Sequence, residues 1–142
     1  MAFDFQPRIV GLMCYWCSYV AADSAGVGRM SQPASLRIVR LNCSGMADPA
    51  YVFKAFASGA DGVLIAGCHP GDCHYTAGNL KAQRRFLLLR SLLAQFGVEP
   101  ERVRLEWIAA SEPGKLVRVV QEMTEQVRAL GPYQPTQEVI RA

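Results

Sequence analysis

Short apolar runs alternate with longer segments of helical periodicity along the chain. Strands are predicted over 8–13, 36–41, 62–67 and 103–107, where apolar residues stand together or alternate with polar ones. The first three of these strands are nearly continuous apolar runs, a pattern typical of strands buried on both faces of a sheet. The fourth alternates, which indicates one polar face.

Four helical segments separate or follow the predicted strands. The first lies among small residues around Ala21–Gly28. The second begins at Asp48-Pro49, a pair typical of a helix start, and ends at Gly59. The third is predicted over about 76–95 and the fourth over about 113–130. In the third helix, the apolar positions are Leu80, Leu89, Leu92, Leu93 and, just beyond its end, Phe96.

The order β-α-β-α-β-α-β-α predicts an α/β fold. We expect an open parallel four-stranded sheet with helices on both faces, the three-layer arrangement of flavodoxin-like and Rossmann-like domains. The length of 142 residues fits one domain. We place this domain at 1–132 and a C-terminal tail at 133–142. The tail is polar and broken by proline, so we expect it to become ordered on a neighbouring subunit.

Composition and charge exclude several classes of protein. Hydrophobic residues make up 51% of the chain and charged residues 19%, which is ordinary globular usage and not that of a disordered chain. The net charge of +3 is too small and too scattered to indicate nucleic-acid binding. No apolar run approaches the length of a membrane span, and no basic segment opens the chain. We therefore expect a cytoplasmic protein without membrane insertion.

The five cysteines are the most informative residues of the composition. Cys14, Cys43 and Cys68 each stand within a residue of the end of a predicted strand. The carboxyl ends of parallel strands meet at one edge of the sheet, where ligands bind near the point at which the strand order reverses. Cys17 lies one helical turn after Cys14, and Cys73 lies in the loop after Cys68. We therefore expect all five thiols to converge on one end of the domain.

Several thiols in one place permit three kinds of chemistry. Four of them could hold an iron–sulfur cluster, with the fifth left over, or a tetrahedral zinc ion. The Cys14-x-x-Cys17 spacing also suits a redox dithiol, in which a helix N-terminus would lower the pKa of Cys17. A domain of this length does not need zinc in order to fold, and a cluster accounts for the most thiols.

Two histidines flank the same loop, in Cys68-His69 and Cys73-His74. Adjacent cysteine and histidine side chains rarely reach one metal. We therefore expect both histidines to donate hydrogen bonds to cluster sulfurs or loop carbonyls. Between them, Pro70-Gly71-Asp72 predicts a turn.

Two surface features accompany the cysteines. Tyr15-Trp16 lies inside the CxxC segment and is expected to cover the site or to contact a partner. A basic stripe, Lys81, Arg84 and Arg85, follows on the third helix. This stripe is either a solvated helix face or a docking surface for an acidic partner.

Three sequence blocks resemble a known family. The segments 14–26 and 43–49, and above all Gly59–Tyr75 with its GCHPGDCHY motif and the following Gly78-Asn79, are similar to the delta subunit of methyl-viologen-reducing hydrogenase. The resemblance extends over about 7–132 and implies an electron carrier with one [2Fe–2S] cluster. The candidate iron ligands are Cys14, Cys17, Cys43, Cys68 and Cys73, of which four would bind the cluster.

The same resemblance implies partners. Members of the family pass electrons from a hydrogenase or formate dehydrogenase to the flavin subunit of a heterodisulfide reductase, within electron-bifurcating complexes. They often carry arginine where this chain has Met46, so a contact made by that arginine is not expected here. No acid, base or substrate motif accompanies the cysteines, which favours a relay without its own substrate site. The rival hypotheses are a dithiol oxidoreductase using Cys14 and Cys17 and a zinc-stabilised adaptor.

Overall fold

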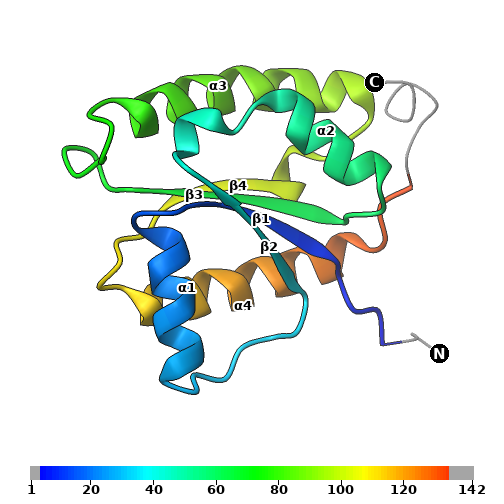
Figure 1. The fold of residues 1–142 in the computed structure, drawn as a ribbon. Helices are drawn as coiled ribbons and strands as arrows, with labels where there is room; N and C mark the ends of the chain where they lie inside the picture. The colour runs from blue at the N-terminus through cyan, green and yellow to red at the C-terminus, as the bar shows by residue number, and fades with distance from the viewer. Residues whose placement is uncertain (1–3, 135–142) are drawn as a thin grey trace.

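The computed structural model describes residues 4–134. Its four strands form one parallel sheet in the order β2-β1-β3-β4 (Figure 1). This arrangement confirms the predicted open parallel sheet. The strands are β1 (Ile9–Cys14), β2 (Leu36–Leu41), β3 (Gly62–Gly67) and β4 (Val103–Trp107).

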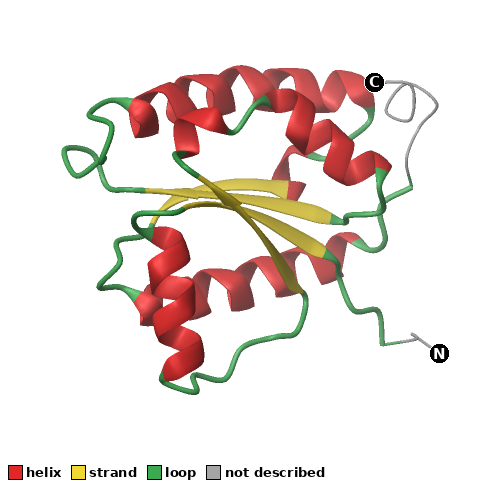
Figure 2. Cartoon of the chain, in the orientation of Figure 1, coloured by secondary structure: helices red, strands yellow, loops and turns green. Residues whose placement is uncertain are grey.

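Helices cover both faces of the sheet, as predicted. Helices α2 and α3 lie over one face and α1 and α4 over the other, giving three layers (Figure 2). The long helices are α1 (Ser18–Val27), α2 (Pro49–Ala57), α3 (Gly78–Leu93) and α4 (Pro113–Leu130). Three short 3-10 helices connect other elements: η1 (Ser44–Met46), η2 (Ala94–Phe96) and η3 (Pro100–Arg102). Within residues 4–134, no helix combines the length and the apolar character that a membrane crossing requires.

The boundaries of α2 follow directly from its sequence. The Asp48 carboxylate accepts the backbone N–H of Ala50 at 2.8 Å, and Pro49 occupies the first turn. Capping of this kind stabilises a helix by about 1 kcal/mol. Gly59, two residues after the helix, has φ +107°, a conformation that glycine adopts without a steric penalty.

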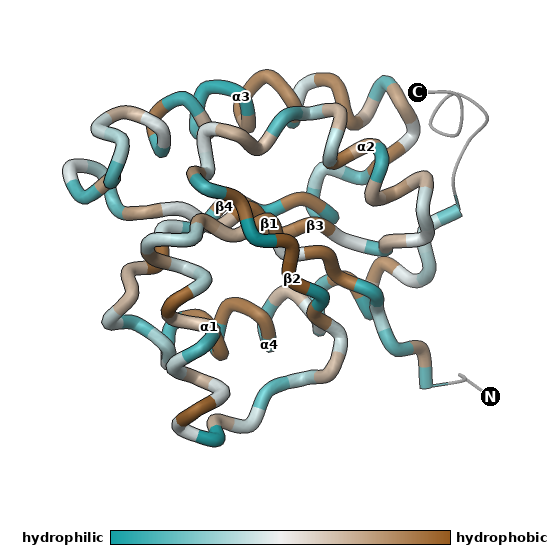
Figure 3. Tube along the Cα trace, viewed as in Figure 1, coloured by the Kyte–Doolittle hydropathy of each residue, from teal (hydrophilic) through white to brown (hydrophobic). Residues whose placement is uncertain are grey.

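The core consists of two apolar layers on either side of β1 and β3, whose residues are buried almost throughout. Hydrophobic residues concentrate along these central strands in Figure 3. Under α2 and α3 the layer includes Leu12, Phe56, Ile65 and Leu89. Against α1 and α4 it includes Met13, Ala21, Leu64 and Met123. The central strands therefore end in a rigid, close-packed setting.

The expectation that β2 is buried on both faces is wrong. Strand β2 lies at the edge of the sheet, and Ile38 and Val39 are 40% and 46% exposed. Arg37 and Arg40 on the same strand are also exposed. These two arginines interrupt the apolar run, and charged side chains of this kind are typical of an edge strand rather than a central one.

Helix α3 also departs from its predicted pattern. Leu89 and Leu93 are buried as expected, whereas Leu80 is exposed and Asn79 is buried in its place. The α-helix is shorter than predicted, because its last turn tightens into η2.

Both ends of the described chain lie at the amino edge of the sheet, opposite the cysteines (Figure 1). The Arg128 guanidinium near the end of α4 donates to the Phe5 carbonyl at 3.3 Å. Tyr133 packs on Phe56, and its backbone N–H donates to the Asp61 carboxylate at 3.0 Å. Tyr133 is buried, so the packed domain includes this first residue of the expected tail. Residues 135–142, to which the proposed ordering on a neighbour mainly applies, lie outside the described residues.

Candidate metal centre

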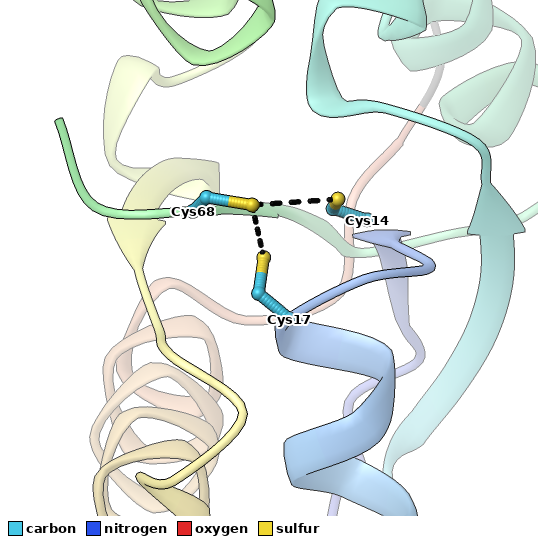
Figure 4. Close-up of side chains that lie close together, drawn as sticks. All are labelled: Cys14, Cys17 and Cys68. Atoms are coloured by element: carbon cyan, nitrogen blue, oxygen red, sulfur yellow. Dashed lines mark hydrogen bonds between the residues drawn. The ribbon is translucent and has the colours of Figure 1, made fainter. Parts of the chain in front are cut away.

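Three buried thiols meet where the strand order reverses. Strand β1 ends at Cys14, Cys17 directly precedes α1, and Cys68 follows β3. Their Sγ atoms all lie within 4.8 Å of one another and point toward a common centre (Figure 4). The Cys14–Cys68 distance is 3.7 Å and the Cys17–Cys68 distance is 2.8 Å. We call these three residues the buried triad.

The other two cysteines form a second group, which we call the loop pair. Cys43 precedes η1 and Cys73 lies in the loop before α3, and their Sγ atoms are 3.9 Å apart. Cys73 also packs against the buried triad. The five thiols therefore form one continuous group at the carboxyl edge, as the strand-end positions predict.

The backbone at Gly45 and Gly78 lies very close to the loop pair and leaves no room for side chains at these two positions. A Cβ at residue 78 would lie 2.0 Å from Cys43 Sγ and 3.3 Å from Cys73 Sγ. A Cβ at residue 45 would lie 2.9 Å from the Gly78 carbonyl oxygen. Glycine at these positions allows η1 and the start of α3 to close around the two sulfur atoms.

Asn79 is a site residue to which the sequence interpretation gave no role. Its buried amide donates to the Cys68 carbonyl at 3.0 Å and to the His69 carbonyl at 2.9 Å. Its side-chain oxygen accepts the backbone N–H of Leu80. Asn79 therefore fixes the cysteine loop to the first turn of α3. Position 79 lies on the buried face of α3 together with Ala82, Leu89 and Leu93, and a polar residue on this apolar face is the signal that could have identified it.

Hydrogen bonding and burial separate the acidities of the triad thiols. The Cys17 thiol, with backbone N–H groups of Trp16 and Ser44, lowers the pKa of Cys14 to about 5 despite burial. The pKa of Cys17 is raised, because its hydrogen bond to Cys14 and its burial both favour the thiol. Burial raises the pKa of Cys68 to about 11. The expectation that a helix N-terminus lowers the pKa of Cys17 is therefore wrong.

The two thiols of the loop pair also differ in pKa. Burial acts to raise the pKa of Cys73, but backbone N–H groups of Asn79, Tyr75 and Gly78 outweigh it and lower the pKa. Burial raises the pKa of Cys43. Each group of cysteines thus contains one thiol whose surroundings favour the thiolate, which is the form that binds metals.

The two histidines contact two different side chains, Glu112 and Trp16. His69 Nε2 lies 2.5 Å from a Glu112 carboxylate oxygen, which links the cysteine loop to the start of α4. The His74 ring stacks on Trp16, with ring centroids 3.7 Å apart. The Asp72 backbone N–H donates to the His69 carbonyl at 2.9 Å, which confirms the turn over Pro70-Gly71-Asp72.

The remaining predicted surface residues are exposed. Tyr15 and Trp16 lie beside the triad, with Tyr75 hydrogen-bonded to Trp16. Lys81, Arg84 and Arg85 are exposed on α3, and the Arg85 guanidinium donates to the Gly45 carbonyl.

The donor set fits a thiolate-bound metal group. Two thiolates on one tetrahedral metal, with bonds of about 2.3 Å, lie about 3.8 Å apart. The Cys14–Cys68 and Cys43–Cys73 distances of 3.7 and 3.9 Å match this spacing. Only the triad places three potential ligand atoms within 4.8 Å of one another among residues 4–134. The arrangement can therefore offer two thiolates to each of two neighbouring metal ions.

Comparison with known proteins gives matches over nearly the whole chain. The sequence model of the family described as methyl-viologen-reducing hydrogenase, delta subunit, matches residues 9–131. The iron-sulfur subunit of the F420-non-reducing hydrogenase vhc of Methanococcus voltae is 52% identical over 132 residues. This match covers 93% of the chain and 92% of that relative.

Two further relatives show the range of proteins that contain such a domain. The iron-sulfur subunit of the F420-non-reducing hydrogenase of Archaeoglobus profundus is 50% identical over 133 residues, covering 94% of the chain and 97% of that relative. A subunit of the ferredoxin/F(420)H(2)-dependent CoB-CoM heterodisulfide reductase of Methanosarcina acetivorans is 38% identical over 126 residues. There the match covers 89% of the chain but 16% of the relative, so the similar region is a small part of a longer protein.

Proposed function

Since the chain belongs to the family of delta subunits of methyl-viologen-reducing hydrogenase, we propose that it is an electron-transfer subunit carrying one [2Fe–2S] cluster. The membership confirms the resemblance given by the three sequence blocks. The proposal rests mainly on one observation: five thiols, in two groups, meet at the carboxyl edge of the sheet where the strand order reverses. When bound, a cluster of this type takes up and releases one electron at a time.

The spacing within the two groups supports two irons rather than one. Cys14 and Cys68 would bind one iron, and Cys43 and Cys73 the other. Cys17 would be the fifth thiol. Its Sγ is 2.8 Å from Cys68 Sγ, closer than the spacing of about 3.8 Å expected for two thiolates on one tetrahedral metal.

The chain's own residues would hold and shield the thiolates. Backbone N–H groups stabilise the charge on Cys14 and Cys73. Asn79 fixes the backbone that carries Cys68, and the Ser18 hydroxyl donates to the Ala66 carbonyl at 2.9 Å, which fixes α1 against β3. Hydrogen bonding near the sulfur atoms and exclusion of water both set the potential of such centres.

We propose that the electron donor is a hydrogenase or a formate dehydrogenase, and that the acceptor is the flavin subunit of a heterodisulfide reductase-like, electron-bifurcating complex. The names of the relatives from Methanococcus voltae and Archaeoglobus profundus support a hydrogenase as the donor. The similar region inside the heterodisulfide reductase of Methanosarcina acetivorans supports the second. The cytoplasmic location stays a prediction from the sequence.

The two rival hypotheses have less support. A dithiol oxidoreductase needs an accessible attacking thiolate, but Cys14 and Cys17 are 1% and 6% exposed. A structural zinc ion needs four ligands at one point. The triad supplies three cysteines within 4.8 Å of one another, and the loop pair lies beside them rather than among them.

Anaerobic purification with metal analysis tests the proposal. We expect a brown protein with about two irons and two sulfides per chain and with no stoichiometric zinc. A colourless protein with one zinc would favour the adaptor. Four irons per chain, with the spectrum of a cubane cluster, would contradict the cluster type while leaving an electron-transfer role.

A further inference from the structure

An exposed aromatic surface, which we call the aromatic cap, lies at the carboxyl edge beside the cysteines: Tyr15, Trp16, His74 and Tyr75. The Trp16 and His74 rings stack with an interplanar angle of 13°. The Trp16 indole N–H donates to the Tyr75 hydroxyl at 3.3 Å, and Tyr15 meets Trp16 edge-on at 5.0 Å. The cap joins the segment of the buried triad to the loop of Cys73.

The cap is exposed although its members are large and aromatic. Tyr15, Trp16 and Tyr75 are 39%, 43% and 52% exposed. Single exposed hydrophobic residues are ordinary, but a contiguous group marks an interaction site. Tryptophan, tyrosine and arginine are the residues most enriched where protein interfaces derive their binding energy. The cap includes His74 and Tyr75, which directly follow Cys73, the least buried of the five thiols.

A cleft of about 260 Å³ opens between the cap and strand β2. Arg40 and Asn42 line the cleft together with the aromatic rings of Tyr15, Trp16 and Tyr75. The Arg40 guanidinium lies 5.0 Å from the centre of the Tyr15 ring, which holds the cation in place. No ion pair within residues 4–134 involves Arg40, and the cleft lining contains no acidic residue. The cleft therefore suits a carboxylate supplied from outside.

Helix α3 extends this positive charge. It begins three residues after Tyr75 and contains Lys81, Arg84, Arg85 and Arg90 but no acidic residue. Within residues 4–134, none of these four cations forms an ion pair. Potentials of this kind steer an oppositely charged partner during encounter.

We propose that the aromatic cap and Arg40 form the docking surface for the acidic face of an electron-transfer partner protein, with one partner carboxylate in the cleft. This proposal rests on the proposed function, because an electron carrier must bring its accessible side close to its partner. The charge complementarity selects an acidic protein surface.

Charged electron acceptors test the potential at the cap without a partner protein. In the reaction, the dithionite-reduced protein gives up one electron, and ferricyanide takes it up to become ferrocyanide. Hexaamminecobalt(III) is reduced in the same way to cobalt(II), but it carries the opposite charge. We expect Arg40→Glu to react roughly fivefold slower with ferricyanide and roughly fivefold faster with hexaamminecobalt(III) at about 10 mM ionic strength, and we expect both differences to vanish at about 0.5 M.

Arg37→Glu is the matched control. Arg37 is also exposed on β2 and gives the same change in net charge, but it pairs in register with Val10, whereas Arg40 pairs with Met13 nearer the cysteines. We expect both of its rates to stay within about twofold of the parent protein. A change in potential would move both acceptor rates in the same direction, so the ratio of the two rates isolates the local charge.

Equal rate ratios in the parent, Arg40→Glu and Arg37→Glu proteins would overturn the docking surface while leaving the proposed function intact. A protein without visible iron–sulfur absorption that gives no electron to either acceptor would overturn both proposals. Iron content and visible spectra of each variant distinguish these cases.

The native complex provides a second readout. Chains carrying Arg40→Glu with Trp16→Ala are followed by size exclusion of native extract with immunodetection. The control chain carries Arg37→Glu with Met30→Ala, because Met30 is 42% exposed, close to the 43% of Trp16, but lies outside the cap. We expect the first chain to elute near its own mass of 15.6 kDa and the control to remain in a larger species. Co-elution of both chains in the same large species would overturn docking through the cap.

Discussion

The buried triad and the loop pair supply the same atom type from two different kinds of structure. The triad stands at the ends of β1 and β3 and the start of α1, inside the packed core. The loop pair stands beside η1 and before α3, where glycine backbone closes on sulfur. The sheet therefore fixes the position of the first group. The second group depends on local loop contacts that can fail independently.

The two groups of cysteines should therefore differ in how well they tolerate substitution. In the triad, three thiols occupy a space for which we propose two iron ligands, so one thiol is a supporting group. In the loop pair, both thiols are proposed ligands. The Cys43 and Cys73 sulfur atoms lie so close to Gly78 that no side chain larger than that of glycine fits there.

Removing a ligand thiol should have the largest effect on cluster binding. We expect Cys68→Ala and Cys73→Ala to abolish the cluster, because the loss of one of four thiolates leaves an open iron position. Cys17→Ala should retain most of the iron. Iron and sulfide content with visible spectra of anaerobically purified variants measures this. Retention of a full cluster in Cys68→Ala, or its complete loss in Cys17→Ala, would contradict the ligand set.

Filling the space around the loop pair should have the next largest effect. Gly78→Ala places a methyl group against Cys43 Sγ, so we expect loss of most of the cluster and destabilisation by about 1–3 kcal/mol. Gly114→Ala is the matched control, since it is also near a helix start but a Cβ there meets nothing within 4 Å. Similar iron content in the two variants would show that the loop pair adapts.

Removing the amide that supports Cys68 should have a smaller effect. Asn79→Asp keeps the oxygen that accepts from Leu80 but removes both N–H groups that serve the Cys68 and His69 carbonyls. We expect a loss of about 1–3 kcal/mol in the free energy of unfolding, measured by urea denaturation of the metal-free protein. If the stability and the cluster lifetime are unchanged, Asn79 does not support the site.

The smallest effect concerns thiol reactivity in the metal-free protein. The lowered pKa of Cys73 and the raised pKa of Cys43 mean that Cys73 carries more thiolate at pH 7. Cys73 is also more exposed, so iodoacetamide should label it several-fold faster. The ionisation advantage should shrink as the pH rises and Cys43 also deprotonates. Peptide mapping by mass spectrometry follows both sites, and faster labelling of Cys43 at pH 7 would contradict the assignment.

The sequence predicted the layers of the fold and the edge at which the cysteines meet. Strand-end positions are sufficient for this, because parallel strands bring their carboxyl ends together. The division of five thiols into three and two could not be predicted, since it depends on how η1 and the start of α3 pack. The role of Asn79 is hidden for the same reason, because its partners are backbone carbonyls of another loop.

The exposure of β2 was missed because strand order is a long-range property. The segment Leu36–Leu41 contains apolar residues typical of a buried strand, but it also contains Arg37 and Arg40, and its place beyond β1 leaves Ile38 and Val39 uncovered. The pKa of Cys17 was misjudged because a helix-end argument omits the neighbouring thiols, whose hydrogen bonds dominate.

The position of both described chain ends at the amino edge makes this fold a module. Attachments at residue 4 or residue 134 start from the side of the sheet opposite the cysteines, where Phe5 and Tyr133 are fastened to the domain (Figure 1). A longer polypeptide can therefore incorporate such a domain at either end without rebuilding the thiol edge. The heterodisulfide reductase relative from Methanosarcina acetivorans, in which a similar region makes up 16% of the chain, is an example of such an incorporation.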